Sequence, residues 1–65
     1  MGSNLYPELA RMLKQAGCRF VRHGKGSHEV WSSPITKRSF SVPREIVKVH
    51  TAYGILKDAG LQKAF

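Results

Sequence analysis

Hydrophobic residues near the start of the chain recur at the spacing of an amphipathic helix. The apolar positions are Leu5, Leu9, Met12, Leu13 and Ala16. They fall on one side of a helix with about 3.6 residues per turn. Pro7 suits a first helical turn, and Gly17 stands where a residue in the left-handed conformation commonly ends a helix. We therefore predict a helix that ends at Ala16 or Gly17.

The middle of the chain changes to short runs that alternate polar with β-branched or aromatic residues. Three strands are expected, at Arg19–His23, Ser27–Ser32 and Ser39–Val42. Gly24 and Gly26 lie between the first two runs, and a proline follows each of the other two. Because consecutive strands with short connections usually pair as hairpins, we predict a three-stranded antiparallel sheet.

A second amphipathic pattern closes the chain. Its apolar positions are Ala52, Ile55, Leu56 and Ala59. Thr51 is the expected N-cap, and Gly60 is the expected end of the helix. Gly54 costs about 1 kcal/mol relative to Ala inside a helix, so we expect it to allow close packing. For Arg44–His50 the pattern fits either a loop or a short turn of helix.

These elements give the order α-β-β-β-α, an α+β fold with two helices on one face of the sheet. The 65 residues allow a single domain, residues 1–65, in which residues 1–3 are expected to be disordered or left over from expression. An apolar fraction of 42% and a charged fraction of 23% exclude a disordered chain and a membrane-spanning one. So small a domain also excludes an enzyme with a large pocket.

The charge pattern indicates a polyanionic partner. Eleven Lys and Arg against four Asp and Glu give a net charge of +7, which favours nucleic acid first and an anionic membrane surface second. Seven of the basic residues lie in the strand region and just after it: Arg19, Arg22, Lys25, Lys37, Arg38, Arg44 and Lys48. The alternative is a solvated basic surface that only keeps the protein soluble.

A flexible basic turn, residues 24–28 (Gly-Lys-Gly-Ser-His), precedes the second expected strand. Lys25 and Ser27 are candidates to bind a phosphate, although the turn is not a P-loop because a strand follows it. His28 is the candidate proton-transfer residue, since neighbouring cations such as Arg22 favour the neutral imidazole that a general base requires. The alternative is a surface histidine without a catalytic role.

Other kinds of chemistry have little support in the sequence. The acidic residues are scattered and the histidines lack zinc-ligand spacing, so we expect no metal site and no cofactor. The single cysteine, Cys18, excludes an internal disulfide, fits a reducing cytoplasm and is expected to be a buried apolar residue. Trp31 is either the main core aromatic or a platform for stacking bases, and the small size of the domain favours the core.

Several segments together resemble one known family. They are the residues 9–17 (Leu-Ala-Arg-Met-Leu-Lys-Gln-Ala-Gly), 20–22 (Phe-Val-Arg), 26–28 (Gly-Ser-His), 40–43 (Phe-Ser-Val-Pro) and 55–61 (Ile-Leu-Lys-Asp-Ala-Gly-Leu). In order and spacing they resemble the HicA toxins over nearly the whole chain. The departures are the turn at residues 33–38, where the family has an Asp-Gly-like pair, the lack of glycine between Pro43 and Thr51, and Gly54 in a helix.

The resemblance implies a fold similar to double-stranded-RNA-binding domains and the activity of an mRNA interferase, a toxin neutralised by the antitoxin HicB. It implies that His28 is the catalytic residue, cleaving RNA without metal. The expected RNA-binding residues are Arg22, Lys25, Gly26, Ser27, Lys37 and Arg38. The expected partners are a HicB-like antitoxin and mRNA, with no membrane, and the expected location is the cytoplasm. The alternative function is a non-catalytic RNA-binding module of the double-stranded-RNA-binding type.

Overall fold

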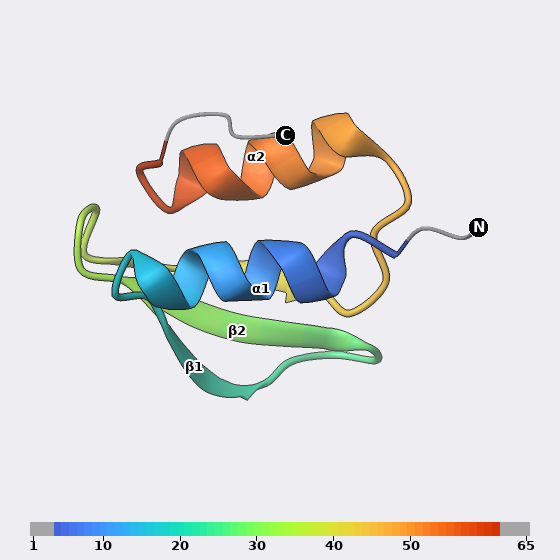
Figure 1. Ribbon diagram of the computed structural model, residues 1–65. Coiled ribbons are helices and arrows are strands. Elements are labelled where there is room, and N and C mark those ends of the chain that lie inside the picture. The colour runs from blue at the N-terminus through green and yellow to red at the C-terminus, as the bar shows by residue number, and fades with distance from the viewer. Residues whose placement is uncertain (1–3, 62–65) are drawn as a thin grey trace.

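The computed structural model describes residues 4–61 and confirms the predicted α-β-β-β-α order (Figure 1). The elements are α1 (Tyr6–Gln15), β1 (Arg19–His23), β2 (His28–Ser33), β3 (Arg38–Pro43) and α2 (Val49–Asp58). The strands form one antiparallel sheet in the order β1-β2-β3, and both helices lie on the same face of it. This is the arrangement expected for a fold like that of double-stranded-RNA-binding domains. The expectation for residues 1–3 lies outside the described residues.

Both helices end in the same way, as the Ala-Gly pairs predict. At the end of α1, Gly17 has a φ of 92° and donates its N–H to the Lys14 carbonyl, while Cys18 donates to the Leu13 carbonyl. Gly60 and Leu61 make the equivalent bonds at the end of α2. These pairs of bonds define the Schellman motif, which satisfies carbonyls that would otherwise lack partners. The sequence Ala-Gly-apolar therefore ends each helix and returns the chain to the core.

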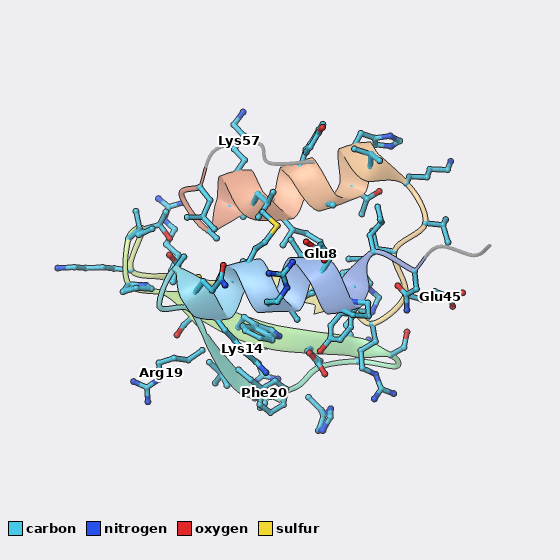
Figure 2. The ribbon with its side chains drawn as sticks, viewed as in Figure 1. Glu8, Lys14, Arg19, Phe20, Glu45 and Lys57 are labelled. Atoms are coloured by element: carbon cyan, nitrogen blue, oxygen red, sulfur yellow. The ribbon has the colours of Figure 1, made fainter. Side chains whose placement is uncertain are left out.

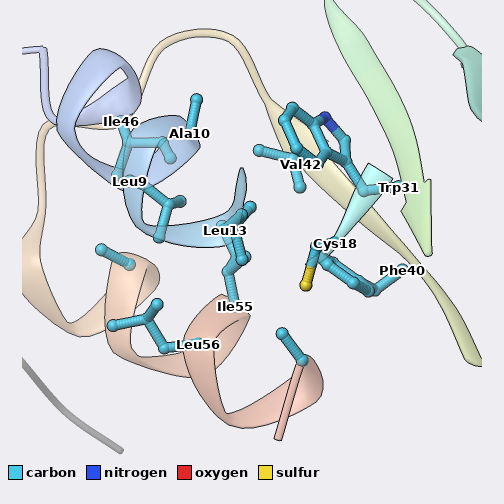
Figure 3. Close-up of a cluster of buried hydrophobic side chains, with 12 residues drawn as sticks. Leu9, Ala10, Leu13, Cys18, Trp31, Phe40, Val42, Ile46, Ile55 and Leu56 are labelled. Atoms are coloured by element: carbon cyan, nitrogen blue, oxygen red, sulfur yellow. The ribbon is translucent and has the colours of Figure 1, made fainter. Parts of the chain in front are cut away.

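The core lies between the helices and the sheet (Figure 3). Trp31 on β2 pairs with Phe40 on β3, and both side chains face the helices with exposures of 2% and 8%. Cys18 is buried beside them, as predicted. Trp31 is thus the main core aromatic and not a platform for stacking bases, because one indole contributes a large part of the apolar area that so small a domain can bury.

The start of α2 differs from the prediction. The residue before the first turn is Lys48, whose extended backbone (φ −111°, ψ 132°) precedes the helix, and Thr51 lies inside the helix and is not its N-cap. Within the segment Arg44–His50, residues 44–48 form a loop and residues 49 and 50 are the first two of α2, so each alternative holds for part of it. The loop is held by Ile46, which is buried and whose N–H donates to the Asn4 side chain at 2.8 Å. The first residue of α2 is therefore set by the anchored loop, and the preference of Thr51 for an N-cap position does not set it.

Gly54 also differs from the prediction. The residue is exposed on α2, and a Cβ built at this position meets no atom within 4 Å. Gly54 therefore serves no close packing in the described structure.

Candidate functional site

The turn between β1 and β2 holds the Gly-Ser-His segment at one end of the sheet. The N–H of Gly24 donates to the His28 carbonyl at 2.8 Å, and the N–H of His28 donates to the Lys25 carbonyl at 3.1 Å. Gly26 has a φ of 59°, in the left-handed region that glycine adopts without strain. Lys25, Gly26 and Ser27 are all exposed. The turn therefore presents a cation, a hydroxyl and backbone groups to a ligand, immediately before His28.

The His28 side chain is exposed, and one ring nitrogen is oriented by the turn. Its Nδ1 lies 3.3 Å from the Lys25 carbonyl oxygen. A carbonyl oxygen only accepts hydrogen bonds, so this contact is a hydrogen bond when Nδ1 carries the proton. In that tautomer Nε2 has a lone pair and is the nitrogen able to accept a proton.

The face of the sheet that turns away from the helices, which we call the open face, is where His28 lies. Burial alternates along β2, so that Glu29, Trp31 and Ser33 face the helices and His28 lies on the open face. Arg22 on β1 pairs with Val30, the next residue of β2 on the open face. Arg22 is thus a diagonal neighbour of His28 across the two strands, within reach of a long side chain.

The loop after β3 lies beside the same turn, which adds a residue that the sequence-based site did not include. The N–H of Arg44 donates to the Ser27 carbonyl at 3.1 Å. A surface depression of about 440 Å³ lies here, lined by Asn4, Tyr6, Ser27, Arg44 and Glu45. The strand register could have indicated Arg44, since His28 pairs with Pro43 and the next residue of the loop therefore lies opposite Ser27.

Two of the predicted RNA-binding residues lie at the other end of the sheet. Lys37 lies in the turn between β2 and β3, where its N–H donates to the Ser33 carbonyl at 2.9 Å, and Arg38 is the first residue of β3. Strand β2 separates them from His28 by about 17 Å, since strands rise about 3.3 Å per residue. The structure therefore brings Arg22, Lys25, Gly26 and Ser27 together with His28, and it does not bring Lys37 and Arg38 to them.

A hydrogen-bonded network lies on the opposite side of β2, directly after His28. The Glu29 carboxylate is 7% exposed, and its Oε1 accepts from the Tyr6 hydroxyl at 2.7 Å and from the Trp31 Nε1–H at 2.9 Å. Burial raises the pKa of the Tyr6 hydroxyl to about 12, and the bond to Glu29 adds to the effect. Burial would raise the pKa of Glu29 as well, but the bonds from Trp31 and Tyr6 and the positive charge of Arg44 lower it below its ordinary value. Glu29 is therefore an ionised buried carboxylate.

Two further observations concern metal and membrane. Within residues 4–61, no three histidine, cysteine, aspartate or glutamate side chains are grouped as a metal ion would need. Neither α1 nor α2 has the length and apolar content that would be needed to cross a membrane.

Comparison with known proteins identifies one family. The sequence model of the family described as "HicA toxin of bacterial toxin-antitoxin" matches residues 6–61, which is nearly the whole chain. Comparisons with curated proteins and with solved structures gave no match.

Proposed function

The chain belongs to the HicA toxin family of bacterial toxin–antitoxin systems, and from this premise we propose that it is an endoribonuclease that cleaves mRNA. The proposed catalytic residue is His28, acting without a metal ion. One observation carries the proposal: Nδ1 of His28 lies 3.3 Å from the Lys25 carbonyl, and when Nδ1 donates to that carbonyl, Nε2 is able to accept a proton. His28 follows directly on an exposed turn of one cationic and two small residues, Lys25, Gly26 and Ser27.

RNA supplies its own nucleophile, the 2′-hydroxyl, so the protein needs to supply little beyond a base and positive charge. Nε2 of His28 takes the 2′-hydroxyl proton as that oxygen attacks the adjacent phosphorus. The bond from phosphorus to the 5′ oxygen breaks, and the leaving oxygen takes a proton from solvent. The products are a 2′,3′-cyclic phosphate and a 5′-hydroxyl end. Proton transfer of this kind is worth about 10²–10⁴-fold in rate.

The positive charge around His28 has a role in the same step. Arg22 and Lys25 are the proposed groups that stabilise the charge developing on the phosphate, as positioned cations do in other phosphoryl reactions. Gly26 and Ser27 bring backbone and hydroxyl groups close to it. Lys37 and Arg38, at the far end of the sheet, bind phosphates further along the RNA strand.

The test of this function replaces His28 with alanine. Cleavage of RNA by His28→Ala is expected to fall by about 10²–10⁴-fold, and inhibition of growth is expected to be lost, while RNA binding is retained. His50→Ala is the matched control, because His50 is exposed on α2 and distant in sequence from the turn. It is expected to cleave as the wild type does.

Two results would contradict the proposal. Full cleavage by His28→Ala would exclude His28 as the base. Salt-dependent RNA binding without any product, in the protein with His28 intact, would favour the alternative of a non-catalytic RNA-binding module.

The family implies a cognate antitoxin, and we propose that it is HicB-like and covers His28 together with the open face. A net charge of +7 favours rapid association with an acidic partner surface. An mRNA substrate and the unpaired Cys18 fit action in the cytoplasm. RNA cleavage by the purified, saturated complex is expected to be blocked, and unimpaired cleavage would exclude occlusion of His28.

A further inference from the structure

A second depression lies at the edge of β1, on the side of the sheet that faces the helices. Its volume is about 300 Å³, and it is lined by Tyr6, Lys14, Phe20, His23, Glu29 and Trp31. These residues come from α1, β1 and β2. Figure 2 shows Lys14 and Phe20 on the same side of the molecule, where β1 extends past α1. We call this depression the edge cleft.

The edge cleft is open because the helices do not cover β1. Phe20 and His23 pair with Trp31 and Glu29, so they belong to the sheet face that carries the helices. All five residues of β1 are nevertheless exposed. Phe20 is 44% exposed and is held in place by edge contacts with His23 and Trp31, at centroid distances of 5.2 and 6.4 Å. An aromatic ring in a defined orientation therefore faces the solvent.

The base of the edge cleft holds the Glu29 carboxylate. Within residues 4–61 it makes no ion pair, since the one salt bridge there joins Arg11 and Glu8. The two neutral donors, Tyr6 and Trp31, both donate to Oε1. A carboxylate accepts about four hydrogen bonds through its two oxygens, so Glu29 retains capacity for donors from a ligand. These two bonds and the positive charge of Arg44 favour the ionised carboxylate, and a ligand with N–H donors would add to them.

The charges at the rim of the edge cleft indicate which ligand carries those donors. Lys14 and His23 line it beside the carboxylate and are exposed. The positive charge of Lys14 at the rim disfavours a lysine or arginine side chain of a protein partner, although such a side chain would suit Glu29 alone. A nucleotide satisfies both features, because its base carries N–H donors and its phosphate is anionic. Aromatic stacking combined with hydrogen bonds to base edges is how proteins recognise unpaired RNA bases.

We propose that the edge cleft binds one unpaired base of the RNA substrate, with the Watson–Crick edge of the base on Glu29 and its ring against Phe20. This inference rests on the proposed function and extends it to the sequence preference of cleavage. Guanine is the preferred base, because its N1–H and amino group lie side by side and match a carboxylate. Uracil is the least favoured, because carbonyl oxygens flank its single N–H. Glu29 follows His28 in the chain but faces the other side of β2, so RNA that reaches both residues passes around the edge of the sheet.

The test measures RNA binding separately from cleavage. Fluorescence anisotropy would compare a uridine hexamer with hexamers that contain a single guanine, cytosine or adenine, using protein with His28→Ala so that no RNA is cleaved. We expect the guanine hexamer to bind about tenfold more tightly than the uridine hexamer, the discrimination typical of one good polar contact to a base. Adding Glu29→Gln is expected to remove most of this preference, because the amide can still accept from Tyr6 and Trp31 but presents N–H where guanine needs an acceptor.

Two variants on β1 distinguish a contact between Phe20 and the base from an effect that any substitution on β1 would have on RNA binding. Phe20→Ala is expected to weaken all four hexamers, because stacking on an aromatic ring tolerates any base. Val21→Ala is the matched control, since Val21 is the exposed neighbour at the irregularity in the strand pairing and does not line the edge cleft. It is expected to bind like the parent protein.

Three outcomes would overturn the inference. The first is equal affinity for all four hexamers, and the second is an unchanged guanine preference in Glu29→Gln. The third is a loss of antitoxin binding in Glu29→Gln with the RNA preference intact, which would assign the edge cleft to the interface with the antitoxin. If Glu29→Gln does not fold, the relative affinities of the four hexamers and the effect of Phe20→Ala on them still test the inference. A base preference without any cleavage by the protein with His28 intact would support the edge cleft and refute the nuclease, so the two failures are distinguishable.

Discussion

At the end of the sheet that carries the turn between β1 and β2, neighbouring residues serve opposite faces. Glu29 and His28 are neighbours in the chain, yet the strand alternation sends them to opposite faces. Tyr6 lines both depressions, one beside Ser27 and the other beside Phe20. Its hydroxyl is bonded to a carboxylate that is ionised at neutral pH, so Tyr6 must keep its proton for the network to persist.

Replacing Tyr6 with phenylalanine tests this network through pH. The pKa of Tyr6 is raised from 10.0 to about 12, so its contribution to stability is present below pH 10 and is lost as the pH rises from 10 to about 12. Tyr6→Phe is expected to lower the free energy of unfolding at neutral pH by about 1.5–3 kcal/mol, the value of a hydrogen bond to a charged group. Denaturant unfolding at pH 8 and at high pH measures the difference, and phenolate absorbance follows the ionisation.

The decisive quantity is the difference in free energy of unfolding between the wild type and Tyr6→Phe. This difference should become smaller as the pH approaches 12, and the phenolate absorbance contributed by Tyr6 near pH 12 should be absent from Tyr6→Phe. A constant difference across the same range would mean that the hydroxyl contributes nothing through its bond to Glu29.

At the scale of elements, the ends of the helices depend on contacts far away in the chain. Gly60 ends α2 with a φ of 85°, and a Cβ at this position would lie 2.7 Å from Cγ2 of Ile35. Ser33, at the end of β2, donates to the carbonyl of Ala59 at 2.7 Å. The end of α2 is therefore packed directly onto the turn between β2 and β3. Gly54, one and a half turns earlier, has open space around it.

Two alanine substitutions in the same part of the chain should have opposite effects. Gly54→Ala is expected to stabilise the protein by about 1 kcal/mol, because alanine loses less conformational entropy in a helix and meets no neighbour. Gly60→Ala is expected to destabilise it by more than about 1 kcal/mol, because the left-handed conformation is strained for alanine and the added methyl meets Ile35. Thermal unfolding of both variants measures the effects.

Gly54→Ala also tests whether a ligand or partner uses the space at this position. Growth inhibition equal to that of the wild type is expected. A stabilised variant that no longer inhibits growth would assign Gly54 a contact outside the isolated chain.

At the scale of the whole molecule, positive charge lies at both ends of the sheet and is not concentrated at His28. Arg22 and Lys25 lie at one end, and Lys37 and Arg38 lie at the other. A strand of RNA that contacts both ends would cross the length of β2. Affinity should then depend steeply on salt, because each neutralised phosphate releases counterions.

Removing one charge at the far end separates binding from chemistry. Arg38→Gln is expected to raise KM and leave kcat unchanged, and to reduce the slope of log affinity against log salt by about 0.7, the value for one contact to single-stranded nucleic acid. Arg11→Gln is the matched control, since Arg11 carries the same charge but lies on α1, paired with Glu8. Cleavage rates and anisotropy over a range of salt concentrations measure both. An equal change in the salt dependence of affinity for Arg38→Gln and Arg11→Gln would contradict the prediction, because it would show that RNA responds to the net charge and not to a contact with Arg38.

The fold could be predicted well from local patterns, and the site only in part. A first helix ending at Ala16 or Gly17, observed as residues 6–15, and the strand of residues 19–23 were predicted from periodicity and from glycine and proline positions, because these depend on neighbours in the chain. The start of α2 was predicted wrongly, because Asn4 anchors Ile46 across 42 residues and so sets where the helix begins. Gly54 was misread, since the apolar positions Ala52, Ile55, Leu56 and Ala59 already place residue 54 on the opposite, exposed face of the helix.

The sequence by itself determined the order of elements, the Gly-Ser-His turn, the net charge and the membership of the HicA family, because each depends on residue types at short spacing. The tertiary structure alone decided which of the basic residues lie near His28, the position of Arg44 beside Ser27, and the buried environment of Glu29. Those features follow from strand register and from the placement of α1, which bring together residues distant in the chain. Spacing along a sequence does not specify such contacts.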